Sequence, residues 1–161
     1  MLLTLVRHGE AALAINGDDS KRPLTERGRT QAQLTAAALH TQFEQSQRLE
    51  ARAQPDVFVV STLLRAQQTL SYLSALYPDV PVMICDHIKP EDDAALALDW
   101  LSQLPYAHIV VVCHMNVVGY LAEMITHEHF DAFALAEGRI YSQQVLAAGL
   151  STEIKRFIPN A

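Results

Sequence analysis

The sequence lacks several features that would assign the protein to a specialised class. Cys85 and Cys113 are its only cysteines, too few for a disulfide scaffold, and we expect both to be reduced thiols in the cytoplasm. Lysine and arginine total 12 against 18 aspartates and glutamates, so the net charge of -6 argues against nucleic acid or an anionic membrane as a partner. The apolar run at residues 1–6 is too short for a signal-peptide core or a membrane span.

What is present is the composition of an ordinary globular domain. Hydrophobic residues make up 50% and charged residues 19% of the 161 residues, and this length is typical of one domain with a sizeable core. The sequence contains no internal repeat, low-complexity tract or Pro- or Ser-rich linker. We therefore predict a single domain over residues 1–161, without a large lid insertion.

Continuous apolar runs predict three buried strands, at residues 2–6, 57–60 and 109–113. Runs of this kind, rich in β-branched residues, suit strands that helices cover on both faces. Two later segments, 140–147 and 153–158, are separated by a glycine and are typical of an antiparallel hairpin. These runs indicate a sheet whose central strands are parallel and whose edge is a hairpin.

Apolar residues recur at helical spacing between the predicted strands. Thr25 is a suitable N-cap for the first helix, and acids precede the third helix at a position that favours a helix start. Residues 45–54 are polar and indicate a helix end or a connection. Since strands and helices alternate, we predict a three-layer α/β/α sandwich with a mostly parallel central sheet and an antiparallel edge hairpin near the C-terminus. The expected helices begin near Thr25, Leu63, Ala94 and Val117.

Cationic and polar residues follow each predicted central strand. Arg7 and His8 come directly after the first, Ser61 and nearby Arg65 after the second, and His114 after the third. Ligands of open α/β sheets bind outside the carboxyl ends of the strands, so these side chains should converge on one edge. Guanidinium groups match phosphate oxygens and stay charged at any working pH. The pattern therefore predicts a small phosphoryl pocket in an otherwise acidic protein.

Three residues of this pocket have expected local roles. Arg65 should lie in the first turn of its helix, where free backbone N–H groups add affinity for anions. Gly9 would let the backbone turn sharply and approach the ligand closely. Ser61 either hydrogen-bonds near the phosphate or caps the following helix, and the sequence favours neither alternative.

These residues lie in three stretches, LVRHGEA, STLLRAQQT and VVCHMNVVGYL. Together the stretches resemble the histidine phosphatase superfamily, in which the histidine of an Arg-His-Gly motif is transiently phosphorylated. The short chain, the stretch KRPLTERGRTQA and the VVGYL after His114 are similar to the SixA-type phosphohistidine phosphatases within that superfamily. The resemblance extends from Leu2 to about Ile125 and implies a hydrolase that acts on phosphoryl groups.

The resemblance implies a role for five side chains. His8 is similar to the family nucleophile, and Arg7, Arg65 and His114 are similar to its phosphate-binding partners. Arg22, in KRPLT, matches an arginine that lies near the pocket in SixA-type sequences. A neutral imidazole is a competent nucleophile toward phosphorus, and arginines stabilise the charge of the transferring group. We expect no cofactor and no metal, because the arginines already neutralise that charge.

The sequence does not identify a general acid. Relatives that act on phosphate monoesters usually carry a carboxylic acid in the segment that here reads ICDHIKPEDD, but His87 stands where a glutamate is common. Asp86, His87 and Glu91 are the proton-donor candidates, and the alternative is a solvated loop before a helix. An imidazole leaving group departs after modest protonation, whereas an alkoxide needs a strong acid. The segment therefore favours phosphohistidine as the substrate.

These observations predict a phosphatase that hydrolyses phosphohistidine on a phosphotransfer protein through a phosphorylated His8. Its partner would be a histidine-containing phosphotransfer domain or another phosphohistidine protein of a signal-transduction pathway. Two alternatives stay open: a small-molecule phosphomonoesterase with the same nucleophile, and an inactive module that binds a phospho-ligand. The stretch His127, Glu128 and His129 is expected to be a polar helix end rather than a metal site, because residues two apart do not share a helix face.

Overall fold

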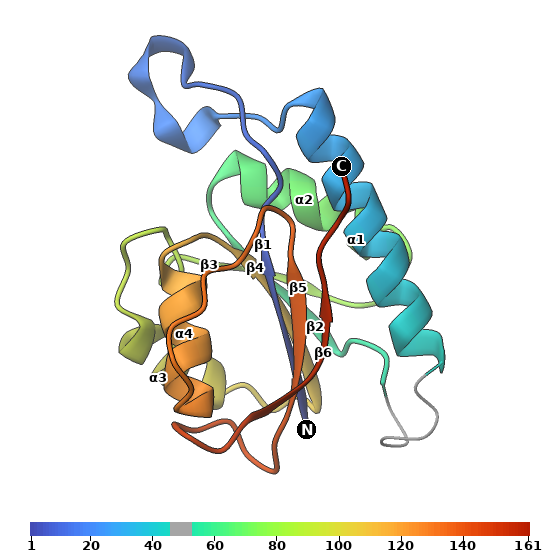
Figure 1. The fold of residues 1–161 in the computed structure, drawn as a ribbon, viewed down its shortest axis with the longest axis vertical. Coiled ribbons are helices and arrows are strands. Elements are labelled where there is room, and N and C mark those ends of the chain that lie inside the picture. Colours follow the sequence, from blue (N-terminus) through green and yellow to red (C-terminus); the bar gives the residue numbers. More distant parts are fainter. Residues whose placement is uncertain (46–52) are drawn as a thin grey trace.

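A computed structural model describes residues 1–45 and 53–161 of the chain. Within these ranges, six strands form one sheet in the order β3-β2-β4-β1-β5-β6 (Figure 1). The strands are β1 (Leu2–Arg7), β2 (Val57–Ser61), β3 (Val82–Cys85), β4 (His108–Cys113), β5 (Gly138–Ser142) and β6 (Thr152–Phe157). The helices of the same ranges are α1 (Glu26–Gln45), α2 (Leu64–Ser74), α3 (Ala94–Ser102) and α4 (Val117–Thr126).

Most neighbouring strands of the sheet are parallel. β1 and β2 flank β4 and run parallel to it, and β3 runs parallel to β2. β5 pairs antiparallel with β1, and β6 pairs antiparallel with β5. The predicted architecture, a mostly parallel sheet with an antiparallel hairpin at its edge, is confirmed.

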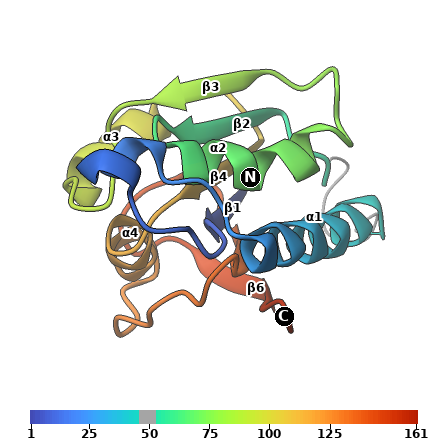
Figure 2. The same cartoon turned by 90° about the horizontal axis from the view of Figure 1, so that it is seen from above.

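Helices cover both faces of the sheet (Figure 2). On one face, Leu39 of α1 and Leu70 of α2 belong to a buried apolar cluster. On the other face, Leu101 of α3 and Leu121 of α4 belong to a second cluster. Burial of such a side chain contributes about 1.5–3 kcal/mol. Every residue of β4, at the centre, is buried, so the carboxyl end of this strand is a rigid support.

The predicted helix starts are confirmed. The Gly28 N–H donates to the Thr25 hydroxyl oxygen at 2.9 Å, so Thr25 caps α1. Asp93 caps α3 by accepting from the Ala95 N–H at 2.8 Å. Arg65 lies in the first turn of α2, as its distance from the end of β2 predicts. In the described part of the chain, no helix is long and apolar enough to cross a membrane.

Two strands differ from the sequence prediction. β3 has no counterpart in the prediction, because it is an edge strand whose Val82 and Ile84 side chains are exposed. β5 ends at Ser142, whereas the pattern predicts a strand over 140–147. Of the apolar residues beyond the end of β5, Leu146 is buried in the cluster that includes residues of α3 and α4, whereas Val145 is exposed. Most of the predicted connection at 45–54 lies outside the described residues.

Candidate active site

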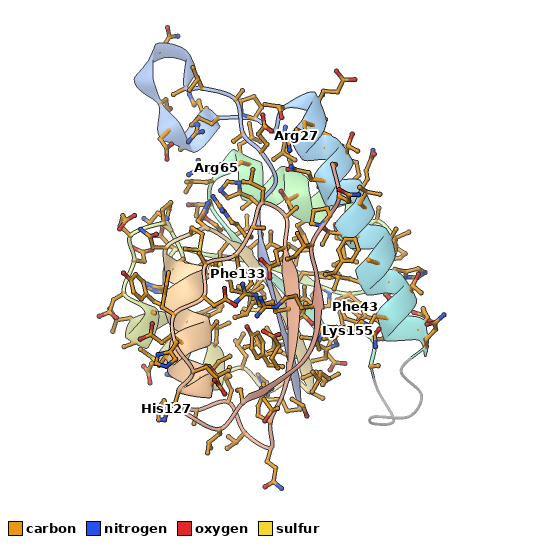
Figure 3. All side chains as sticks on the ribbon, in the orientation of Figure 1. Arg27, Phe43, Arg65, His127, Phe133 and Lys155 are labelled. Atoms are coloured by element: carbon orange, nitrogen blue, oxygen red, sulfur yellow. The ribbon has the colours of Figure 1, made fainter. Side chains whose placement is uncertain are left out.

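The carboxyl ends of the parallel strands bring the predicted cationic residues to one edge of the sheet. Arg7 ends β1 and lies opposite Cys113, which ends β4. The His8 N–H donates to the Cys113 carbonyl at 3.0 Å, and this bond places His8 beside His114. Arg65 reaches the same edge from α2, at the upper end of the sheet in Figure 3. The four side chains therefore converge from three places: the end of β1, the end of β4 and the first turn of α2.

His8 is oriented by its main-chain contact. Its Nδ1 lies 2.6 Å from the Gly9 carbonyl oxygen. A carbonyl only accepts, so Nδ1 carries the proton and Nε2 of the neutral ring keeps its lone pair. Arg65 Nε donates toward this Nε2 at 3.4 Å, and the His114 ring lies 5.1 Å from the His8 ring between centroids. The free lone pair of His8 thus points into the cluster of cationic residues.

Burial keeps both histidines neutral near pH 7. Loss of contact with water is the main cause that lowers the pKa of His8 to about 4. The positive charges of Arg65, Arg7 and Arg22 act in the same direction. Burial also lowers the pKa of His114 to about 3, and the charges of His8 and Arg65 add to this effect. Because its ring is neutral near pH 7, His114 acts on a ligand as a neutral N–H donor and not as a cation.

Two buried nitrogens of the site have no protein partner. Arg7 donates through NH1 to the Phe133 carbonyl at 2.7 Å, but its Nε has no hydrogen-bond partner among the described residues. His114 Nδ1 also has no partner in this part of the chain. Buried polar groups are almost always hydrogen-bonded. Arg7 Nε and His114 Nδ1 therefore indicate a polar ligand for this site.

Ser61 contacts His114 and the turn before α2, but it does not occupy the N-cap position of that helix. Its hydroxyl oxygen lies 2.7 Å from His114 Nε2 and accepts from the Leu63 N–H at 3.3 Å. Leu63 occupies the N-cap position of α2, without a side-chain capping bond. The capping alternative for Ser61 is therefore wrong. The contact with His114 fixes the ring plane of that histidine.

Asp19 accepts hydrogen bonds from Arg22 and Arg65, and the sequence analysis did not identify it. It belongs to a short 3-10 turn, Asp19–Lys21, within the polar stretch before α1. Arg65 donates to the Asp19 carbonyl at 2.9 Å and to its carboxylate at 3.2 Å. Arg22 donates to the same carboxylate at 3.2 Å and to the Ala12 carbonyl at 2.8 Å. The spacing of Asp19 and Arg22, three residues apart, was the available signal.

The carboxylate of Asp19 is a poor proton donor in this arrangement. Although partial desolvation acts in the opposite direction, the hydrogen bond from Arg22 and the charge of Arg65 lower the pKa of Asp19. The side chain is 59% exposed, so water and salt screen its ion pair with Arg65. Asp19 is therefore an ionised group that an incoming anion can replace on the two arginines.

Gly9 is required by close packing. Its backbone φ is not in the left-handed region, so the sharp turn expected from the sequence does not explain the residue. A Cβ at this position would lie 2.5 Å from the Gly28 carbonyl oxygen at the start of α1. The Gly9 N–H donates to the Thr69 hydroxyl at 3.1 Å, and Thr69 donates in turn to the Arg65 carbonyl at 2.8 Å. Thr69, one helical turn after Arg65, was also missed.

The three proton-donor candidates do not contact the four converging side chains. Asp86 pairs with Lys89 at 2.9 Å and is largely exposed. His87 is exposed, and its N–H donates to the Sγ of Cys85. Glu91 is exposed and accepts from the Asn116 side-chain amide at 3.1 Å, on the loop that follows His114. Of the three, only Glu91 touches a residue close in sequence to the site.

The other candidates are structural. His127 is the C-cap of α4 in a left-handed conformation, as expected for a polar helix end. Among the described residues, no group of histidine, cysteine, aspartate and glutamate side chains is arranged to hold a metal ion. Cys113 is buried in the core, and burial raises the pKa of its thiol to about 12, so it is no nucleophile.

The geometry can be compared with known proteins. The family model of the histidine phosphatase superfamily (branch 1) matches residues 3–89, which is more than half of the chain. The chain belongs to the histidine phosphatase superfamily. The matched range includes Arg7, His8 and Arg65 but ends before His114. No curated protein matches the sequence.

Solved structures extend the similarity over nearly the whole chain. The protein histidine phosphatase SixA, solved with tungstate, is 26% identical with a TM-score of 0.80 and covers 98% of this chain and 97% of its own. The SixA protein of Agrobacterium tumefaciens is 19% identical with a TM-score of 0.79 over the same shares. A mycobacterial glucosyl-3-phosphoglycerate phosphatase is 16% identical with a TM-score of 0.69, over 94% and 96%. The last two show the shared fold.

Proposed function

We propose that this chain removes the phosphoryl group from phosphohistidine on a phosphotransfer protein, through a covalent phosphohistidine at His8. Membership of the superfamily supports phosphatase activity, and the structural similarity to the SixA proteins supports the protein substrate. The observation that carries the proposal is the tautomer of His8. Its Nδ1 proton is held by the Gly9 carbonyl, so Nε2 carries the lone pair needed for attack, and this lone pair accepts a long hydrogen bond of 3.4 Å from Arg65 Nε.

The phosphoryl oxygens would bind where the site offers unpaired donors. Arg7 Nε is such a donor, and His114 Nδ1 is one when the Ser61 hydroxyl donates to His114 Nε2; both are buried and have no protein partner in the described chain. Arg65 and Arg22 add positive charge, and Asp19 gives way to the incoming anion. The N-terminal end of α2, where Arg65 lies, adds the partial positive charge of the helix dipole. These groups would stabilise the charge that spreads over the equatorial oxygens during transfer.

The reaction proceeds in two steps. In the first, His8 Nε2 forms a bond to phosphorus, the bond from phosphorus to the substrate imidazole breaks, and that imidazole takes up a proton from solvent. In the second, water attacks phosphorus, the bond to His8 breaks, and inorganic phosphate leaves with the oxygen of that water while one proton returns to solvent. His8 returns to the neutral form, which its low pKa favours.

The chemistry around the leaving group favours phosphohistidine. Asp19 stays ionised between two arginines, and Asp86 and His87 make no contact with the site. An imidazole leaves readily with little help from a strong acid, unlike an alkoxide. A single domain over residues 1–161 without a lid would leave the pocket open to a histidine on another protein's surface. The cytoplasmic location inferred from the sequence stays a prediction.

The decisive experiment compares substrates. Purified protein is incubated with a phosphohistidine-containing phosphotransfer domain and, separately, with a panel of sugar phosphates, and phosphate release is followed. We expect release from the phosphotransfer domain and loss of that release in His8→Ala. Activity confined to the sugar phosphates contradicts the proposal. Tight phosphate binding without any turnover would instead identify a binding module.

Glu91 supports a second candidate, a small-molecule phosphomonoesterase. It is the one carboxylate of the 86–93 segment that contacts the loop after His114, through Asn116. If the enzyme uses it as a proton donor, Glu91→Gln lowers turnover of sugar phosphates about 10²-fold or more and leaves turnover of phosphohistidine nearly unchanged. Equal, small effects on both substrates exclude this role.

A further inference from the structure

A short segment lies directly behind Arg7. We call residues 133–137 the backing segment; it leads into β5 and contacts the end of β1 at three points. The Arg7 N–H donates to the Glu137 carbonyl and the Ala136 N–H donates to the His8 carbonyl, both at 3.0 Å. Arg7 NH1 donates to the Phe133 carbonyl at 2.7 Å. Both the main chain and the guanidinium of Arg7 are therefore held by one segment.

The backing segment adopts a conformation that needs support. Ala136 has a φ of 56°, in the left-handed region that costs about 1–2 kcal/mol for residues other than glycine. The Thr35 hydroxyl of α1 donates to the Ala136 carbonyl at 2.6 Å and holds this turn in place. Strained residues of this kind persist only where surrounding contacts determine the geometry, and they concentrate at functional sites.

The carboxylate of Glu137 closes the backing segment on itself. It is 1% exposed, and one of its oxygens accepts from the Ala134 N–H at 2.6 Å. The other oxygen accepts from Arg139 Nε at 2.7 Å. The Arg139 guanidinium in turn lies over the Phe133 ring, 3.7 Å from its centroid, and Phe133 lies at the centre of Figure 3. Glu137 thereby holds the Ala134 N–H directly and the Phe133 ring through Arg139. These two groups lie on either side of the Phe133 carbonyl that binds Arg7.

We propose that Glu137 is a positioning residue for Arg7, because its carboxylate holds the Phe133 carbonyl in the place where it binds Arg7 NH1. This inference rests on the proposed role of Arg7 in binding the phosphoryl group. With NH1 held, the Nε edge of the guanidinium remains directed to the ligand, and Nε is buried with no hydrogen-bond partner among the described residues. A carbonyl orients an arginine without neutralising its charge, so Arg7 keeps its affinity for an oxyanion.

Charge supports the same role. Burial lowers the pKa of Arg7, and the negative charge of Glu137 opposes this shift. Glu137 itself is bound to Arg139, so it does not compete with the ligand as a direct partner of Arg7. The carboxylate therefore stabilises the charged form of Arg7 from a distance while leaving its Nε edge open.

The first test is the variant Glu137→Gln. The two oxygens of Glu137 accept from the Ala134 N–H and from Arg139. Glutamine has one side-chain oxygen, and its amide nitrogen only donates, so the variant keeps one of these two hydrogen bonds and loses the other. Loosening of the backing segment should lower kcat/KM for the phosphotransfer domain roughly 10- to 100-fold, since displacement of a catalytic group by about 1 Å has such effects. The matched control is Glu153→Gln, which weakens an ion pair with Arg156 at 2.8 Å. Arg156 also lies 3.5 Å from Glu137, but Glu153 itself makes no hydrogen bond to the backing segment, so the control tests the adjoining network alone. The control should stay within about twofold of wild type.

A double-mutant cycle separates positioning from loss of stability. Glu137→Gln is compared with wild type in the presence of Arg7 and again in an Arg7→Ala background, well below each protein's unfolding temperature. If Glu137 acts through Arg7, its substitution has an effect of less than about twofold once Arg7 is absent. Equal losses in both backgrounds, or no loss with Arg7 present, overturn the proposal.

A second variant keeps the test valid if the single variant does not fold. Glu137→Gln combined with Arg139→Met leaves no unpaired buried charge, and it is carried through the same cycle. Failure of the proposed function has a different signature, since wild-type protein then releases no phosphate. In that case binding of tungstate replaces turnover in the cycle, and unchanged tungstate affinity in Glu137→Gln contradicts the inference.

Discussion

The described part of the chain contains two clusters of arginines, and different partners hold them. In the pocket, the guanidinium of Arg7 is held by a carbonyl and that of Arg65 by an exposed carboxylate on a short turn. In the second cluster, Arg139 is 2% exposed, and each of its three nitrogens donates to the protein. Arg156 beside it pairs with Glu153 at 2.8 Å and with Asp131 at 2.8 Å.

The difference in hydrogen-bond partners separates arginines that are available to a ligand from arginines that stabilise the folded structure. The second cluster borders a cavity of about 560 Å³, larger than a phosphoryl group needs, yet its arginines are already paired with carboxylates. In the pocket at the strand ends, two buried nitrogens have no hydrogen-bond partner within residues 1–45 and 53–161. The partners of an arginine, rather than the size of the nearby cavity, therefore indicate where an anion binds.

The largest expected effect is a loss of activity in the pocket. Arg65→Ala should lower kcat/KM for the phosphotransfer domain about 10³-fold, or ~4 kcal/mol, because a charge-stabilising donor is removed from the transition state. Arg156→Ala, its counterpart in the second cluster, should change kcat/KM by no more than about twofold. Initial rates of phosphate release measure both. Comparable losses in the two variants would contradict the separation of the clusters.

The second cluster should instead respond in stability. Arg139→Met leaves the Glu137 carboxylate buried without its closest charged partner, and we expect a loss of about 3 kcal/mol in the free energy of unfolding. Arg65→Ala should cost less stability than this, because Asp19, its charged partner, is exposed. Urea unfolding followed by circular dichroism compares the two. If Arg65→Ala destabilised the protein more than Arg139→Met, the pocket and not the second cluster would be the main contributor to stability, which contradicts the comparison.

Stability should fall in acid because buried histidines resist protonation. His108 is fully buried between the Ala53 carbonyl and the Thr4 hydroxyl, and burial lowers its pKa to about 4. The unfolded chain binds this proton near pH 6.5, so the contribution of His108 is complete above that pH and is lost as the pH falls toward 4. We expect a loss of about 2 kcal/mol from His108 between pH 7 and pH 5.

The pocket histidines should differ from His108 in one respect. A bound oxyanion favours the protonated forms of His8 and His114. Saturating phosphate should therefore reduce the loss in the free energy of unfolding that these two histidines cause between pH 7 and pH 5. It should leave the part from His108 unchanged. Urea unfolding from pH 7 to pH 5, with and without phosphate, measures both parts. Stability that does not change over this range would contradict the burial of three neutral histidines.

The smallest expected effect concerns Asp19. Asp19→Asn removes the carboxylate that occupies Arg65 and Arg22, so inorganic phosphate should bind roughly threefold more tightly, within the 0–1 kcal/mol that exposed ion pairs contribute. Isothermal titration calorimetry measures the affinity, and Asp18→Asn, on the neighbouring residue, is the control. Weaker phosphate binding in Asp19→Asn would mean that Asp19 assists the ligand instead of competing with it.

Much of the pocket follows from local sequence pattern. Apolar runs predict the parallel strands, and residues placed directly after such runs, including Arg7, His8 and His114, must appear at the same edge of the sheet. The N-cap at Thr25 is likewise a local signal that the structure confirms. A buried strand and a helix cap each depend on the types of a few adjacent residues. Both can therefore be predicted from the sequence without coordinates.

The remaining features depend on contacts that leave no local pattern. Phe133 contributes a main-chain carbonyl to Arg7, and every residue has one, so its role cannot be inferred from its type. Gly9 is explained by the approach of Gly28, which depends on where α1 packs. β3 was missed because an exposed edge strand does not show the burial of a central one. Asp19 lay in a stretch that composition alone indicates to be a loop.

The central claim is that His8 attacks phosphorus through Nε2. The most direct measurement is intact-mass analysis of the enzyme quenched in base during turnover of the phosphotransfer domain, with the site of the adduct mapped after digestion. We predict one phosphoryl group on His8, labile in acid, that forms and decays at rates consistent with turnover and is absent in His8→Ala. An adduct on another residue, or undiminished phosphate release by His8→Ala, would contradict the account.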